Sequence, residues 1–182
     1  MDLAPGVLLV ADPALLDPNF RRTVILLCDH NAEGSFGLVL NRPTELHLPE
    51  VLAEPVGLDH LLYLGGPVQM DTLHYLHAYA DEVDDAVAVL DGVGWGGPFE
   101  EIVERVRLGQ LDGEGFRFFV GYSGWGPGQL ATEVDEGGWV VLPASAPQVF
   151  DGDPAVLWRD IMRGLGGEYA LLSNYPDDPQ MN

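Results

Sequence analysis

Lysine is absent from this chain of 182 residues, and all eight of its basic residues are arginine. Without lysine, the protein cannot carry a phosphate-loop lysine, a Schiff base with pyridoxal phosphate or a kinase-type lysine. The chain contains 29 acidic residues, which gives a formal net charge of −21. A surface this acidic repels nucleic-acid phosphates and anionic membranes unless arginines cluster, so we expect no direct nucleic-acid or membrane partner.

Cysteine is almost absent as well. Cys28 is the only one, which excludes an internal disulfide and any zinc site built from several thiolates. It ends the apolar run Val24–Cys28, where we expect a buried thiol that packs as a small hydrophobic side chain; a reactive thiol is the alternative. We expect no metal and no cofactor.

Long hydrophobic runs are also missing. The longest apolar stretches, around Thr23–Cys28 and Phe116–Tyr122, have the length of strands, well below the roughly 18 to 20 residues of a membrane span. The first residues, Met1–Pro5, carry an acid where a secretory signal would carry positive charge. We therefore expect a cytoplasmic protein.

The length and the hydrophobic content of the chain predict one domain over residues 1–182. Hydrophobic residues make up 47% of the chain, which is enough to form a core, and the length suits a single domain. Residues 174–182 are polar and contain proline, so we expect a flexible tail there.

Hydrophobic patterning predicts a mixed sheet with helices packed on it. Helical spacing and early prolines or acids predict four helices, and a hairpin loop is expected at residues 29–35. The predicted strands are Gly6–Ala11, Arg22–Cys28, Phe36–Asn41, Leu61–Leu64, Leu73–Tyr79, Ala86–Leu90, Phe116–Tyr122 and Trp139–Leu142. The predicted helices are Pro49–Glu54, Pro98–Leu108, Pro127–Asp135 and Pro154–Leu165.

Several segments stand in the order of a known family. They are Gly6–Ala11, Asp29–Gly34, Gly37–Pro43, Gly65–Val68 and the stretch Gly121–Leu130, followed by Trp139, Pro143 and Trp158-Arg159. By these segments the chain resembles the AlgH/YqgE family of bacterial proteins over nearly its whole length. The resemblance implies an α+β fold in which a mixed, strongly bent sheet forms a pseudo-barrel flanked by helices. The resemblance also brings the label of transcriptional regulator. The net charge of −21 argues against direct contact between this chain and DNA.

The loop from Tyr122 to Gln129 is the first candidate binding site. It leaves a strand and opens a helix, where glycines let the backbone approach a ligand and free N–H groups favour an anion. A tight turn with Trp125 over the core is the alternative. The hypothesis takes as ligand-binding residues His30, Asn31, Arg42, Tyr122, Ser123, Gly124, Trp125, Gly126, Gln129 and Glu133.

Three further patterns each have a functional and a structural interpretation. Ser123 suggests a hydrolase with His30 or His77 as its partner, although Trp125 breaks the Gly-x-Ser-x-Gly motif. Asp71, His74 and His77 have metal-like spacing, but on a strand the two histidines point to opposite faces. Arg42 and Arg159 stand at positions that match the family; they could hold an anion or pair with acids.

We therefore predict a non-enzymatic binding or regulatory module for a small molecule or a protein, and assign no catalytic residue. A hydrolase that uses His30 or Ser123, and a protein–protein adaptor without a small-molecule site, are the alternatives. The spatial arrangement of these residues distinguishes the three.

Overall fold

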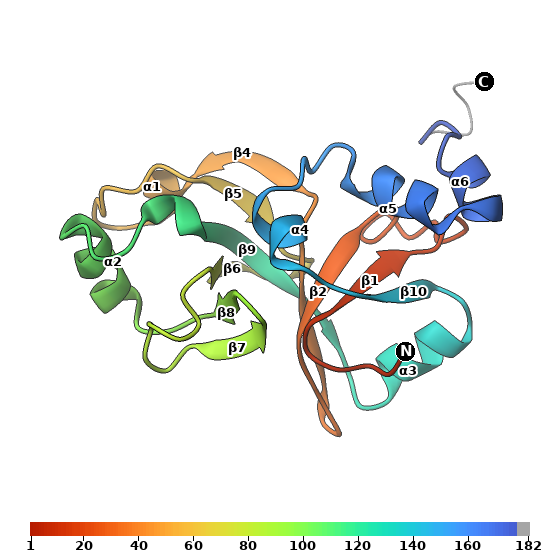
Figure 1. Ribbon diagram of the computed structural model, residues 1–182, viewed down its shortest axis with the longest axis horizontal. Helices are drawn as coiled ribbons and strands as arrows, with labels where there is room; N and C mark the ends of the chain where they lie inside the picture. The colour runs from red at the N-terminus through yellow and green to blue at the C-terminus, as the bar shows by residue number, and fades with distance from the viewer. Residues whose placement is uncertain (178–182) are drawn as a thin grey trace.

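The structure, a computed structural model, describes residues 1–177 (Figure 1). The α+β prediction is confirmed, with ten strands and six α-helices in this range. The strands are β1 (Val7–Ala11), β2 (Val24–Asn31), β3 (Gly34–Val39), β4 (Pro43–His47), β5 (Leu61–Leu64), β6 (Val68–His77), β7 (Val87–Leu90), β8 (Val93–Trp95), β9 (Phe116–Trp125) and β10 (Trp139–Pro143). The helices are α1 (Leu48–Val51), α2 (Phe99–Arg107), α3 (Gln129–Asp135), α4 (Ala146–Phe150), α5 (Leu157–Leu165) and α6 (Gly167–Leu172), with a short 3-10 turn at Gly113–Gly115.

The sheet is mixed and open. Its strands follow the order β10-β1-β2-β3-β9-β6-β8-β7, and β4 and β5 extend it beside β9. Neighbouring strands are antiparallel except for the pair β5 and β9. Within residues 1–177, β10 and β7 end the order without pairing to each other, so the expected pseudo-barrel is not closed. Figure 1 shows β1, β2 and β10 on one side of the molecule and β7 and β8 on the other.

Strands β1 and β2 lie at the centre of the core, buried on both faces. All five residues of β1 are buried, and so are the first five of β2. One face packs against Trp158 and Met162 of α5. The other packs against Leu130 of α3 and the side chains of Trp125 and Trp139. Burial on both faces explains why these strands have continuous apolar sequences.

Several elements differ from the predictions because strand pairing overrides local polarity. The expected loop at residues 29–35 is largely strand, since His30 pairs with Ser35 and Asn31 with Gly34. Strand β9 continues through Trp125, because Ser35 pairs with it. Strand β8 lies between the predicted strand Ala86–Leu90 and the predicted helix Pro98–Leu108, and it was not predicted; nor were β4, α4 and α6. Polar or short segments of this kind become ordered through their partners.

Two glycine-rich segments of the family pattern cross each other in direct backbone contact. A Cβ atom on Gly66 would collide with the backbone of Tyr122 and Ser123, and one on Gly65 would collide with the Gly121 carbonyl oxygen. Gly121 itself has a φ of +67°. These glycines let two segments of the chain approach, which explains their presence without any ligand.

Two buried groups, one within β2 and one at the end of β6, have shifted pKa values. Burial raises the pKa of the Cys28 thiol, and the nearby Asp29 charge acts in the same direction. Cys28 is 1% exposed, as expected for a core thiol. His77 is fully buried; its Nε2 donates to the Gly96 carbonyl at 2.9 Å, and its Nδ1 accepts from the Tyr79 amide at 3.2 Å.

The free energy of unfolding is expected to fall as the pH drops below about 6.5, because burial lowers the pKa of His77. The unfolded chain then binds a proton that the folded chain resists, at up to about 1.4 kcal/mol per pH unit. Urea titrations between pH 7.5 and 5.5 measure this slope in the wild type and in His77→Gln, in which it should be smaller. Equal slopes would contradict the assignment.

No helix among the residues described is long and apolar enough to cross a membrane. In the same part of the chain, no three His, Cys, Asp or Glu side chains gather as a metal site. Strand β6 contains all three residues with metal-like spacing, Asp71, His74 and His77.

Candidate functional site

Four arginines converge on one cleft, which we call the arginine cleft. It has a volume of about 390 Å³ and lies between the β1–β2 connection, the residues after β3, and helix α5. The chain has only eight basic residues, so half of them meet here. The cleft is lined by Pro18, Arg21, Arg22, Asn41, Arg42, Pro154, Ala155, Trp158, Arg159 and Asp177.

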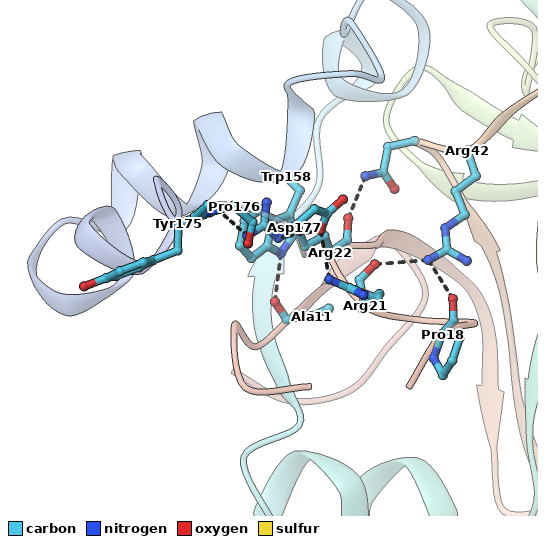
Figure 2. A network of polar contacts seen from close by, with 10 residues as sticks. Ala11, Pro18, Arg21, Arg22, Arg42, Trp158, Tyr175, Pro176 and Asp177 are labelled. Atoms are coloured by element: carbon cyan, nitrogen blue, oxygen red, sulfur yellow. Dashed lines mark hydrogen bonds and ion pairs between the residues drawn. The ribbon is translucent and has the colours of Figure 1, made fainter. Parts of the chain in front are cut away.

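Arg42 holds one wall of the arginine cleft in place. Its Nη1 donates to the Asn19 carbonyl at 2.6 Å. Its Nη2 donates to the carbonyls of Pro18 at 3.2 Å and Arg21 at 3.1 Å, as Figure 2 shows. Partial burial lowers the pKa of this guanidinium; Asp177 and Asp17 act against that change and Arg21 with it. Arginine stays protonated in proteins, so the wall keeps its positive charge.

Arg22 is fixed by both its backbone and its side chain. The Asn41 side chain accepts from the Val24 amide at 2.9 Å and donates to the Arg22 carbonyl at 2.8 Å. The Arg22 guanidinium lies over the Trp158 ring, 4.9 Å from its centroid, and the Trp158 indole donates to the Ala11 carbonyl at 2.8 Å (Figure 2). The backbone of Arg22 has a φ of +54°, a conformation that is rare outside glycine. This packing fixes the position of the charge.

Among the residues described, Arg159 supplies the one buried side-chain donor of the cleft that lacks a partner. Its Nε atom is buried and makes no hydrogen bond with any residue described. A buried N–H without an acceptor costs about 1 to 3 kcal/mol, more when the group is charged. An anion in the arginine cleft would relieve that cost.

The C-terminal residues border the same cleft. Of the tail expected at residues 174–182, residues 174–177 contact the fold, and residues 178–182 lie outside the part described. Asp177 is the one acidic residue among the described residues that line the cleft. It pairs with Arg21 at 3.3 Å and with Arg22 at 3.0 Å. The local charge of the cleft is therefore positive in a strongly acidic protein.

The contacts of the predicted loop from Tyr122 to Gln129 are with itself and with neighbouring parts of the fold. Ser123 is fully buried and donates to the Gly65 carbonyl at 3.0 Å. The Gln129 side chain accepts from the Gly126 amide at 3.0 Å, which closes the loop. Tyr122 stacks on Phe36 with ring centroids 4.7 Å apart. Gly124 lies opposite Phe36 in the sheet.

Glu133 joins this loop to the core. Its Oε2 accepts from the indole N–H groups of Trp125 at 3.0 Å and Trp139 at 2.9 Å, and its Oε1 accepts from Gln129 at 3.0 Å. Trp125 is 5% exposed and packs edge-to-face on Trp139. The arrangement corresponds to the alternative considered for this loop, a tight turn with Trp125 over the core.

His30 and Asn31 lie at the β2–β3 hairpin, apart from Arg42. His30 Nδ1 and Ser35 Oγ are 2.7 Å apart, while the Asn31 side chain accepts from the Glu33 amide at 2.8 Å. Since Ser35 pairs with Trp125, the hairpin adjoins the predicted loop. The hydrogen-bond partners of Ser123 and His30 are Gly65 and Ser35, so the two do not form a catalytic pair. Arg42 follows the opposite end of β3.

A second, acidic cleft lies on the other side of the β1–β2 connection. It has a volume of about 400 Å³ and includes Gln129 and Glu133 of the predicted set. Its other lining residues are Leu15, Asp17, Phe20, Glu136, Gly138 and Trp139. The structure thus brings Gln129 and Glu133 to one cleft and Arg42 to another.

Sequence reasoning named Arg42 and Arg159 but missed the adjacent pair Arg21-Arg22 and Asp177. One signal could have identified the pair. In a chain without lysine, Arg21-Arg22 is the only place where two basic residues are adjacent. Trp158, which also lines the cleft, is 4% exposed and belongs to the core.

Comparisons with known proteins agree on the family. The family described as AlgH-like matches residues 8–170. A UPF0301 protein of Chlorobaculum tepidum is 45% identical over 180 residues, which cover 99% of this chain and 96% of that protein. A UPF0301 protein of Cytophaga hutchinsonii is 39% identical over 181 residues, covering 99% and 100%.

Two solved structures share the fold. Protein DIP2367 from Corynebacterium diphtheriae superposes with a TM-score of 0.82 at 27% identity, covering 96% of this chain and 94% of that one. The AlgH protein from Pseudomonas aeruginosa has a TM-score of 0.72 at 29% identity, covering 98% and 100%. The family resemblance is confirmed, and no activity is stated in the names of these proteins.

Proposed function

The chain belongs to the AlgH-like family, and from that premise we propose that it is a non-enzymatic binding module that holds an anionic ligand in the arginine cleft. The observation that carries the proposal is the gathering of Arg21, Arg22, Arg42 and Arg159 around one concavity in a chain of net charge −21. Like charges brought this close repel each other, and an anion among them removes that repulsion.

The chemistry of the donors favours phosphate or carboxylate groups. Guanidinium groups present planar pairs of N–H donors that match both anions, and charge-assisted hydrogen bonds of this kind are the stronger ones. Arg22 is held by the Trp158 ring, and Arg42 by three carbonyls, so the charges are positioned before a ligand arrives. Positioned donors lose less entropy on binding.

The proposed ligand is a small anion or a short acidic segment of a protein. The acidic surface outside the cleft opposes nucleic acids, and we continue to expect no direct nucleic-acid or membrane partner. A cytoplasmic location remains part of the proposal. The hydrolase alternative gains nothing from the geometry, because Ser123 is buried against Gly65.

Replacing Arg159 by glutamine is expected to weaken binding of a probe anion at least about tenfold. The change removes a charged, buried donor, and a hydrogen bond to a charged group is worth about 1.5 to 3 kcal/mol. Isothermal titration calorimetry at low ionic strength, with inorganic phosphate, pyrophosphate and citrate as separate probes, measures the affinity. Citrate against the two phosphates distinguishes the two anion classes.

Arg107→Gln is the matched control. Arg107 lies on α2 and is exposed, and its side chain bonds only to the Glu104 carboxylate of its own helix among the residues described. The Arg107→Gln substitution removes the same charge as Arg159→Gln, at a position outside the arginine cleft. The proposal fails if no probe binds the wild type, or if Arg159→Gln and Arg107→Gln reduce affinity equally. Thermal melts of both variants establish that each is folded.

A further inference from the structure

The C-terminal segment already places an anion in the arginine cleft. The Asp177 Oδ1 atom lies 3.0 Å from Arg22 Nε and 3.3 Å from Arg21 Nη2, so one carboxylate oxygen bridges two guanidinium groups. Arg22 Nη2 also donates to the carbonyls of Tyr175 at 2.6 Å and Pro176 at 3.2 Å (Figure 2). Three consecutive residues thus use the donors that an external anion would need.

The segment is held close to the cleft by contacts outside it. The Arg163 guanidinium donates to the Asn174 side chain at 2.7 Å, and the Tyr175 amide donates to the Leu172 carbonyl at 3.2 Å. The buried Ser173 hydroxyl donates to the Ala170 carbonyl at 2.8 Å. Because α6 keeps the segment near the cleft, its effective concentration there is high, on the order of millimolar or more.

The ion pairs themselves are exposed and therefore easily exchanged. The Asp177 side chain is 71% exposed, whereas those of Arg21 and Arg22 are 35% and 23% exposed. Ion pairs with one partner this exposed contribute little, because water and salt screen them. By contrast, Arg159 Nε is buried and makes no hydrogen bond with the described part of the segment. An external anion that reaches Arg159 as well gains an interaction that Asp177 lacks.

We propose that Tyr175–Asp177 is an internal competitor that occupies the arginine cleft and is displaced when an external anion binds. This inference rests on the proposed function, since it concerns the regulation of the same site. The segment raises the concentration of ligand needed for occupancy, and its release on binding changes the surface around α6. Ligand binding is thereby coupled to the position of residues 175–177.

Asp177→Asn in the full-length protein tests the competition. The substitution keeps the size of the side chain and removes its charge, so inorganic phosphate should bind about two- to fivefold more tightly than to the wild type, the range expected for losing an exposed pair. Asp135→Asn, at the exposed end of α3, is the matched control and should leave the affinity unchanged. A second readout follows the backbone amide resonances of Tyr175 and Asp177 during phosphate titration of the wild type, where they should move toward unfolded positions.

The outcomes separate this inference from the proposed function. If phosphate binds the wild type in an Arg159-dependent manner, yet Asp177→Asn does not bind more tightly and the Tyr175 and Asp177 resonances stay in place, the competition is refuted and the binding site stands. If the probe binds neither the wild type nor Asp177→Asn, the proposed function is refuted and the competition with it. Tighter binding in Asp177→Asn together with release of the segment supports both.

Discussion

Replacing Gly121 by alanine is expected to remove at least about 3 kcal/mol from the free energy of unfolding. Two effects combine at this position. Its φ of +67° is strained for any residue with a Cβ atom, and that atom would lie 2.5 Å from the Gly66 carbonyl oxygen and 3.1 Å from that of Val68. Both contacts are with backbone, so neither neighbour can rotate away. Urea unfolding at constant pH measures the loss.

Gly137→Ala separates the collision from the backbone strain. Gly137 follows α3 with a φ of +82°, and a Cβ atom there would meet nothing within 4 Å. It should therefore lose only about 1 to 2 kcal/mol, from the left-handed conformation alone. Equal losses in the two variants would show that the crossing of the 65–68 and 121–123 segments is not tightly packed. A strongly destabilised Gly121→Ala chain that fails to fold agrees with the prediction, provided that Gly137→Ala folds.

Replacing Glu133 by alanine is expected to destabilise the protein by about 2 to 4 kcal/mol. The change leaves the indole N–H groups of Trp125 and Trp139 without their acceptor, and both tryptophans are 5% exposed. Buried donors that lose a charged acceptor cannot recover it fully from water. Urea unfolding gives the loss, and the two indole N–H resonances should shift and exchange faster with solvent.

Glu136→Ala is the matched control for Glu133→Ala. Glu136 caps the same helix, is exposed, and has no side-chain hydrogen bond to any residue described. It should change stability by no more than about 0.5 kcal/mol. If Glu133→Ala costs no more than this control, the carboxylate is not the link between the Gly121–Leu130 stretch and the core. The same pair of variants tests whether the acidic cleft matters for anion binding, which should be unaffected by either.

The glycine-rich stretches show the limit of what the local sequence predicts about close contacts. The glycines of residues 121–128 suggest close approach, and in that respect the pattern is informative. The partner that approaches Gly121 is the backbone at Gly66, some 55 residues away, rather than a ligand. Only the pairing of β9 with β5 and β6 brings these segments together. No local window of sequence contains that pairing.

The β2–β3 hairpin and Ser123 show that long-range packing also decides which polar residues are available for function. The polar run from Asp29 to Gly34 looks like a loop, yet it is mostly strand, because β3 pairs along it. Ser123 comes directly after the predicted strand Phe116–Tyr122 in a motif-like context, yet it lies within β9, whose alternation points it inward to Gly65. Burial and pairing, which depend on the whole fold, decide whether a polar side chain is available for chemistry.

The sequence by itself determined which chemistry the protein can contain. The absence of lysine, the single cysteine and the positions of most strands and helices follow from composition and hydrophobic spacing, which are local properties. The tertiary structure alone decided that Arg21-Arg22, Arg42, Arg159 and Asp177 meet in one cleft. They converge because β1, β2 and β3 are adjacent in the sheet and α5 packs on the first two. Such convergence depends on long-range packing, which side-chain spacing along the chain does not specify.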